Sequence, residues 1–203
     1  MTSVRQQNFL LRKEKILAMA ETLLLDNNQD ITLSELATEL DIAKGTIYKH
    51  FKSKNQLYLE LIILNETRLL EISQKYNNDI KTYVSEYMLY NMLNSNRTIL
   101  LHVIEERLTN SERKLKELFE KLYQIREQRI IEIKDMTSDY LKSLDSAMSI
   151  RDYLSYVWTV TYGASLLLNS TYYQKSIGSR ERLIKLYVNQ ALMTPDKISH
   201  AVL

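Results

Sequence analysis

Apolar residues recur with helical spacing along most of the chain, and the pattern is clearest just after residue 30. Four of them lie at positions i, i+3, i+4 and i+7 and predict one face of a short helix: Leu33, Leu36, Ala37 and Leu40. Thr32 and Glu35 have the spacing of a capping box, in which each side chain accepts a hydrogen bond from the other residue's backbone N–H. This pair therefore predicts where the helix begins. A break at residues 41–42 predicts the turn that follows it.

A second short helix after this break has an exposed face suited to a groove of DNA. Ile47 and Phe51 lie about one turn apart and are expected to point inward. On a helix with about 100° per residue, four small, hydroxyl-bearing, aromatic or cationic residues point outward: Gly45, Thr46, Tyr48 and Lys49. Two short helices joined by a tight turn, of which the second exposes such residues, are typical of a helix-turn-helix.

Local charge supports this interpretation. The chain has 27 basic and 25 acidic residues, and its formal net charge of +2 does not by itself predict a nucleic-acid partner. The segment from Ile42 to Leu59, however, has no acidic residue and four lysines: Lys44, Lys49, Lys52 and Lys54. A lysine-rich surface turn is one explanation, but phosphate contacts also need such local positive charge. Ser53 and Gln56 predict a further helix start beside Lys54, where backbone N–H groups could bind a phosphate.

The segment from Ile16 to Leu61 resembles the DNA-binding domain of TetR-type transcriptional regulators. ILAMAETLLL is similar to the first helix of that family, and TLSELATELDI, from Thr32 to Ile42, is similar to the second. The family signature G-T-I/L-Y-x-H/Y-F-x-x-K-x-x-L is matched at Gly45, Thr46, Ile47, Tyr48, His50, Phe51, Lys54 and Leu57. The chain departs from the family at Asp41, where glycine is frequent, but Asp tolerates the left-handed backbone better than most residues.

The resemblance implies roles for individual residues. Those expected to face the major groove are Lys44, Gly45, Thr46, Tyr48 and Lys49. Those expected mainly to hold phosphates are Tyr48, His50 and Lys54, while Thr32 and Ser34 would contact the DNA from the preceding helix. Phosphate contacts position a protein on DNA, whereas Lys44 and Lys49 could also recognise guanine O6 and N7. A basic leader before the first helix (Arg5, Arg12, Lys13 and Lys15) would either reach the minor groove or remain a frayed terminus.

Composition narrows the class of protein. Three glycines and one proline in 203 residues leave few signals for strands and turns, and 45% hydrophobic residues suffice for one small and one larger domain. The absence of cysteine excludes disulfides and thiolate chemistry, and the three histidines are far apart in sequence. We therefore expect an all-α protein with no catalytic residue, metal or cofactor. A cytoplasmic location is expected because MTSVRQQNFLLRKEK lacks the apolar core of a signal peptide.

The chain beyond residue 53 is predicted to be a series of helices. Their expected ranges are 54–76, 79–93, 98–108, 111–140, 153–174 and 180–193, with Thr194 and Pro195 ending the last. We accordingly divide the chain into a three-helix DNA-binding domain, residues 1–53, and a larger helical ligand-binding and dimerisation domain, residues 54–203.

Two arginines interrupt the inward face of the helix expected over residues 111–140. The apolar residues of that face are Leu115, Phe119, Leu122, Ile130 and Ile133, yet Arg126 and Arg129 project near its centre. A buried cation is costly unless it is paired. The arginines could form a buried ion pair with Glu105 or Glu106, extend their charged ends to water, or bind an amphipathic anionic ligand. The candidate ligand-binding residues are Tyr87, Arg126, Arg129, Trp158 and Tyr162.

The 22 residues from Tyr153 to Gln174 carry no charge. That length could span a bilayer, but seven Ser, Thr and Asn side chains argue against it, and no membrane contact is expected. A helix that is apolar around most of its girth is otherwise buried on several sides. In the family that the chain resembles, the last two helices meet those of a second copy in a four-helix bundle. The resemblance thus implies a homodimer.

Together these patterns predict a dimeric, sequence-specific DNA-binding transcriptional regulator. It would repress from a palindromic double-stranded operator, and a small-molecule effector in the C-terminal domain would relieve operator binding. The alternative is a helical-bundle adaptor or small-molecule-binding protein that keeps the fold without specific DNA regulation. A helical-bundle enzyme would need clustered carboxylates and histidines, such as an E-x-x-H motif, which the sequence lacks.

Overall fold

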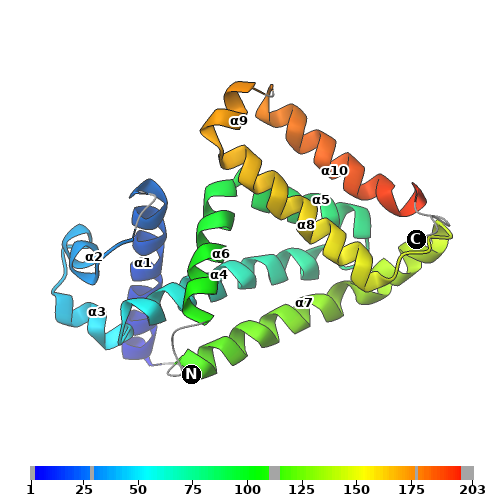
Figure 1. The fold of residues 1–203 in the computed structure, drawn as a ribbon. Coiled ribbons are helices and arrows are strands. Elements are labelled where there is room, and N and C mark those ends of the chain that lie inside the picture. Colours follow the sequence, from blue (N-terminus) through cyan, green and yellow to red (C-terminus); the bar gives the residue numbers. More distant parts are fainter. Residues whose placement is uncertain (1–2, 28–29, 110–114, 177, 198–203) are drawn as a thin grey trace. The chain divides into compact units, whose positions relative to one another are not determined.

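The computed structural model describes residues 3–27, 30–109, 115–176 and 178–197. Within these ranges the chain forms only helices, as expected (Figure 1). The helices are α1 (Val4–Asn27), α2 (Leu33–Glu39), α3 (Lys44–His50), α4 (Lys54–Lys75), α5 (Ile80–Leu93), α6 (Ser95–Thr109), α7 (Lys116–Ser143), α8 (Ile150–Asn169), α9 (Thr171–Ser176) and α10 (Arg180–Lys197). None of the helices in these ranges is both long and apolar enough to cross a membrane.

The chain packs as two compact units. The first unit contains residues 1–65 and 100–121, and the second contains residues 66–99 and 122–203. Three helices, α4, α6 and α7, contribute residues to both units. These units follow packing and not function, so the division between residues 53 and 54 stays a prediction.

The core of the first unit forms where α2 packs against both α1 and α3. Ile16, Leu36, Ile47 and Phe51 have no more than trace exposure, so each of the three helices contributes an apolar face. Tyr58 of α4 is also fully buried. Its hydroxyl donates to Asp30 Oδ1 at 2.6 Å and accepts from the backbone N–H of Ile31 at 3.0 Å, which fixes the segment that leads into α2.

Local hydrogen bonds set where these helices begin. The predicted capping box of α2 is present: Thr32 Oγ1 accepts from Glu35 N at 3.1 Å, and Glu35 Oε2 accepts from Thr32 N at 2.7 Å. Asp41, between α2 and α3, has the left-handed backbone expected there, with φ of 50°. Before α4, Ser53 Oγ accepts from the backbone N–H of Gln56, whose side chain accepts in turn from Lys52 N.

The basic stretch expected to precede the first helix is instead part of it. Ser3 Oγ accepts from Gln6 N at 3.2 Å, and Gln6 Oε1 accepts from Ser3 N at 2.8 Å. This capping box starts α1 at Val4, so Arg5, Arg12 and their basic neighbours are helical.

The core of the second unit lies among α5, α8 and α10, which pack against one another (Figure 1). α5 contributes a face of buried residues that includes Ile80, Tyr83, Val84, Tyr87, Met88 and Asn91. Tyr153, Val157 and Ala164 of α8 and Ala191 of α10 complete this core. Arg180, at the start of α10, donates to Met92 O at 3.0 Å and to Ser95 Oγ at 3.1 Å, so it satisfies groups where α5 ends and α6 begins.

Several helix boundaries differ from the sequence prediction, among them the end of α7 at Ser143 and the start of α8 at Ile150. α6 begins at Ser95 and not near residue 98, while the uncharged segment divides at Ser170 into α8 and α9. α10 continues through Pro195 to Lys197, although Thr194 and Pro195 were expected to end it. A proline inside a helix removes the hydrogen bond of its own N–H and its ring crowds the carbonyl four residues earlier, but here it falls in the last turn, which ends two residues later. Asn110 or Ser111 was expected to cap the start of the helix predicted over residues 111–140, and both lie outside the described residues.

Candidate nucleic-acid interface and ligand site

The sequence of α3 divides it into a buried face and an exposed face, as its periodicity predicts. Ile47 and the following Phe51 are fully buried, whereas Lys44, Gly45, Tyr48 and Lys49 are exposed and Thr46 is half-buried. A methyl group added at Gly45 would meet no atom within 4 Å. The exposed face of α3 is therefore open to another molecule.

A shallow depression of about 530 Å³ adjoins this face, between α2 and α3. It is lined by Ser34, Ala37, Thr38, Asp41, Ile42, Ala43 and Lys44. Thr32 and Ser34 are exposed at and beside the start of α2. The structure thus brings the candidate residues of α2 close to those of α3, and their contacts with DNA stay a prediction.

The lysines of this segment are not electrostatically equivalent. Lys54 Nζ lies 2.5 Å from Asp30 Oδ2, while no carboxylate of the described chain forms an ion pair with Lys44 or Lys49. Burial raises the pKa of Asp30, but the hydrogen bonds from Lys54 and Tyr58 outweigh this effect and hold the pKa below its ordinary value. Asp30 is therefore charged at neutral pH and partly neutralises the positive charge of Lys54. The charges of Lys44 and Lys49 are not neutralised in this way.

His50 is more buried than its predicted role in phosphate binding requires. It is 8% exposed, and the ring of Phe9 stacks on it with centroids 4.1 Å apart. Burial lowers the pKa of His50, and the positive charges of Arg12 and Lys13 lower it further. The imidazole is thus neutral at neutral pH, so His50 would contact a phosphate as a neutral hydrogen-bond donor and not as a cation.

The lowered pKa of His50 predicts that the protein loses stability in mild acid. The unfolded chain binds the proton near the ordinary histidine pKa of about 6.5, whereas the folded chain resists it. The contribution of His50 to the free energy of unfolding should therefore be constant above about pH 6.5 and should decline as the pH falls below it. Urea unfolding of the wild type and of His50→Gln between pH 8 and 5 measures the effect, and the variant should show a flatter decline. Phe9→Ala exposes the imidazole of His50 to water and should therefore reduce the decline of stability with falling pH in part. Equal slopes in all three proteins would contradict this explanation.

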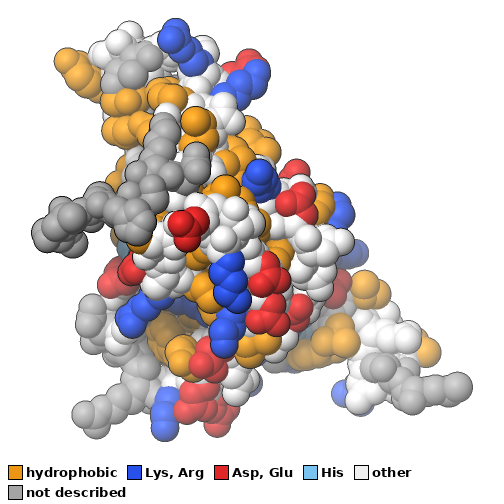
Figure 2. All heavy atoms as spheres, turned by 90° about the vertical axis from the view of Figure 1, so that its right-hand side faces the viewer, with side chains coloured by type: hydrophobic (Ala, Val, Ile, Leu, Met, Phe, Trp, Pro, Cys, Tyr) orange, Lys and Arg blue, Asp and Glu red, His pale blue; other side chains and the backbone are white. Residues whose placement is uncertain are grey.

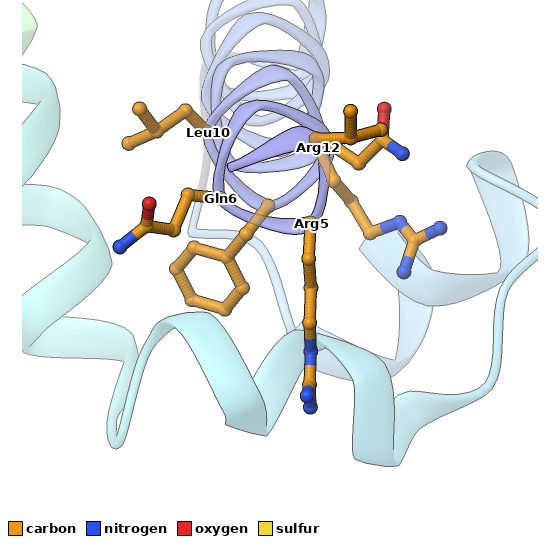
Figure 3. A pocket seen from close by; sticks show the side chains of 7 residues that line it. Arg5, Gln6, Leu10 and Arg12 are labelled. Atoms are coloured by element: carbon orange, nitrogen blue, oxygen red, sulfur yellow. The ribbon is translucent and has the colours of Figure 1, made fainter. Parts of the chain in front are cut away.

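Residues of the first turns of α1 line an open depression of about 920 Å³ (Figure 3). In Figure 3, which looks along α1, Gln6 and Leu10 point to one side of the helix, Arg12 points to the opposite side and Arg5 points downward between them. Lys13 is engaged elsewhere, because its Nζ lies 2.5 Å from Glu60 Oε2 and 5.6 Å from the centre of the Phe51 ring. Arg5, Arg12 and Lys13 were among the basic residues that could reach the minor groove of DNA. In the structure Arg5 and Arg12 line this depression of the protein, while Lys13 holds α1 against α4.

Residues 16–61, which contain most of this interface, match the family model for bacterial regulatory proteins of the tetR family. The chain carries a TetR-family N-terminal domain. It is 34% identical over 82 residues to the HTH-type transcriptional regulator QacR of Staphylococcus aureus, and 31% identical over 84 residues to the HTH-type transcriptional regulator AcrR of Shigella flexneri. These alignments cover 40% and 41% of this chain but 44% and 35% of the two relatives. The likeness therefore spans less than half the length of either relative.

Outside the TetR-family domain, the second unit contains a buried cluster of charged residues. Arg126 Nη2 lies 3.0 Å from Glu66 Oε1, and Arg129 Nη1 lies 3.3 Å from Glu66 Oε2. The side chains of Glu66 and Arg129 are only 10% and 14% exposed. Glu105 and Glu106 were the expected partners of these arginines, and Glu66 was not among them. No short-range pattern indicates this contact, because 60 residues separate Glu66 from Arg126.

Two tyrosines of α5 lie beside this cluster. The guanidinium of Arg129 lies 5.5 Å from the centre of the Tyr87 ring, and the Tyr83 and Tyr87 rings are 6.0 Å apart. Burial raises the pKa of both tyrosines, so both are neutral. Burial lowers the pKa of Arg129, but the charge of Glu66 outweighs it and the pKa remains above the ordinary value. Three of the candidate ligand-binding residues, Tyr87, Arg126 and Arg129, thus come together around Glu66.

The buried face of α7 differs from the expected one at Ile130, which is 43% exposed. The inward stripe consists of residues spaced by four, three, four and four positions: the buried Leu122, Ile133 and Thr137 and the partly buried Arg126 and Arg129. This spacing averages close to 3.6 residues per turn. Ile130 follows Arg129 directly and so points about 100° away from it. Arg126 and Arg129 thus lie on the inward side of α7, where the sequence predicted them, whereas Ile130 does not.

The other two candidate ligand residues lie on α8. Trp158 is 55% exposed, and its ring centre lies 6.4 Å from that of the half-buried Tyr162. An exposed tryptophan beside a tyrosine is more typical of a protein interface than of an enclosed ligand site. Their assignment as ligand-binding residues stays a prediction. Within the described ranges, no group of three or more His, Asp and Glu side chains could hold a metal ion.

Proposed function

We propose that this protein is a sequence-specific DNA-binding transcriptional repressor. The observation that carries the proposal is the exposed face of α3, which presents Lys44, Gly45, Thr46, Tyr48 and Lys49 above the buried Ile47 and Phe51. The match of residues 16–61 to the tetR family model supports it. α3 would enter the major groove, Lys54 and Tyr48 would bind phosphates, and Thr32 and Ser34 would contact the DNA from α2.

The proposal includes a homodimer formed by α8 and α10. Large apolar side chains remain exposed on these helices although the opposite faces are buried: Trp158, Leu166, Leu186 and Met193. Figure 2 shows hydrophobic side chains on the upper part of the face that it draws. A second copy of the chain would cover them through a self-complementary contact. Two copies of α3 would then meet a palindromic operator with half-sites about 34–36 Å apart.

A small-molecule effector in the second unit is proposed to relieve operator binding. The buried cluster around Glu66 supports this, because charged groups in an apolar core are common at functional sites. Glu66 belongs to α4, the helix that begins at Lys54 beside the proposed DNA contacts. An effector that binds better to one conformation of α4 would change DNA affinity by linkage. An adaptor that keeps the fold without binding DNA is the alternative.

Variants of two lysines test the DNA interface. The probes are a duplex selected from a random library by the wild type and a duplex of random sequence. Lys54→Ala should weaken binding to both duplexes and reduce the slope of log K against log salt by about one. Lys49→Ala should weaken binding to the selected duplex more than to the random one, because Lys49 is placed to contact bases. Fluorescence anisotropy across salt concentrations measures both effects.

Two further variants control this experiment. Lys142→Ala removes an exposed lysine from α7 and should leave DNA binding unchanged. Asp30→Asn removes the charge that partly neutralises Lys54 and should strengthen binding to both duplexes. Failure of the wild type to enrich any duplex, or unchanged affinity in both lysine variants, would refute the proposed interface and favour the adaptor.

A further inference from the structure

We propose that the effector is an amphipathic carboxylate that displaces Glu66 from Arg129. This inference rests on the proposed regulation by a ligand and specifies its chemistry. In the unliganded protein the carboxylate of Glu66 would occupy the position that the carboxylate of the effector takes when it binds.

The geometry of the ion pair leaves Arg129 available for a better partner. Glu66 divides its two oxygens between two arginines, and only the pair with Arg126 is also a hydrogen bond, at 3.0 Å. Among the described residues, neither Glu66 Oε2 nor Arg129 Nη1 has a hydrogen-bond partner, although both atoms are buried. Guanidinium binds a carboxylate most strongly through two parallel N–H···O bonds. A free carboxylate could form this bidentate contact with Arg129, whereas Glu66 does not.

The surroundings of Arg129 favour an anion with an apolar body. The aromatic rings of Tyr83 and Tyr87 are buried beside the guanidinium, and both belong to the apolar core of the second unit. An apolar group would lose water-exposed surface against them, and low polarity would strengthen the attraction between Arg129 and a negative charge. A cation would instead have to approach two guanidinium groups. The chemistry therefore selects a carboxylate such as an aromatic or fatty acid.

Displacement of Glu66 would carry the binding event to α4. When a ligand carboxylate takes Arg129, Glu66 would keep Arg126 but would lie beside a second negative charge, and the repulsion between the two carboxylates would displace it. Glu66 is part of the single helix from Lys54 to Lys75. A conformation of α4 that releases Glu66 is then stabilised by the effector, and DNA affinity changes with its population.

The test measures ligand binding without DNA, by the shift in unfolding temperature of the full chain. The probes are decanoate and benzoate, their uncharged amides, and inorganic phosphate. We expect a carboxylate to stabilise the wild type and its amide to have no effect. Arg129→Met should weaken the apparent affinity for the carboxylate about tenfold or more, as expected for loss of a charged hydrogen bond. Arg129→Lys keeps the charge but cannot bind in a bidentate manner, and should weaken it less. Arg151→Met, at an exposed arginine of α8, is the matched control.

Glu66→Gln distinguishes displacement from a merely structural ion pair. This variant keeps the shape of the side chain but removes the competing charge, so it should bind the carboxylate more tightly than the wild type, by about tenfold. Tighter binding in Glu66→Gln together with weaker binding in Arg129→Met supports the proposal. Equal shifts with carboxylate and amide, a shift with phosphate alone, or no shift with any anion in either protein would overturn it.

Failure of this inference can be distinguished from failure of the proposed function. A wild type that binds its selected duplex but no carboxylate refutes only the inference about the effector. A protein that binds a carboxylate through Arg129 but enriches no duplex refutes only the proposed repressor.

Discussion

Replacement of Leu186 by glutamate is expected to convert the protein from a dimer into monomers. Leu186 is 49% exposed on α10 of the single chain, and the proposed interface would bury it. A symmetric interface contains the substitution twice, and each buried, unpaired carboxylate costs several kcal/mol. Loss of the dimer also separates the two copies of α3, so affinity for a palindromic duplex should fall by about a hundredfold or more. Sedimentation at micromolar concentration and fluorescence anisotropy measure the two effects.

The neighbouring Lys185 provides the matched control. Its side chain is 71% exposed and pairs with Glu181 one turn earlier, at 2.7 Å. Lys185→Glu changes the charge of α10 by two units, yet it should leave the dimer intact because exposed pairs of this kind contribute only about 0.3–0.5 kcal/mol. A wild type that sediments as a monomer, or an equal loss of dimer in both variants, would contradict the assignment of the interface.

Truncation of Phe51 to alanine should be the most destabilising single change in the first unit. Phe51 is fully buried directly after α3, beneath Lys13. Removing such a ring leaves a cavity and typically costs about 3–5 kcal/mol. Because Phe51 and Ile47 support the exposed face of α3, DNA affinity should fall with stability. The free energy of unfolding in urea measures the change.

Phe9→Ala is the comparison for Phe51→Ala, because both remove a phenyl ring from the same unit. Phe9 is 47% exposed, and its ring stacks on that of His50. Its loss should cost no more than about 1.5 kcal/mol, the upper range for an aromatic pair. Similar losses of stability in the two variants would show that Phe51 does not anchor α3.

Short-range patterns in the sequence predicted the first unit well. The Thr32–Glu35 capping box, the left-handed Asp41 and the buried pair Ile47 and Phe51 all involve residues within about one or two turns of each other, and the structure contains each of them. Ser3 and Gln6 have the same capping-box spacing and form the same pair of hydrogen bonds. The start of α1 was therefore predictable and was missed.

Contacts between residues far apart in sequence could not be predicted in the same way. Glu66 meets Arg126 and Arg129 only because α4 and α7 pack in the second unit, and periodicity within α7 does not indicate which acidic residue lies opposite. Ile130 was expected on the buried face of α7 but is 43% exposed, because it follows Arg129 directly and points about 100° away from it. The exposure of Trp158 likewise depends on packing, since a single helix does not specify which of its apolar faces its own chain covers.

The division of α3 into two faces has a consequence for the evolution and redesign of specificity. The residues that hold the helix in place, Ile47 and Phe51, are separate from those proposed to contact bases, and a side chain at Gly45 would meet no other part of the protein. Changes at Gly45, Tyr48 and Lys49 should therefore have little effect on folding. Related genes could acquire different operators by substitution at these positions alone, and a combinatorial library there could be screened for new targets without first stabilising the scaffold.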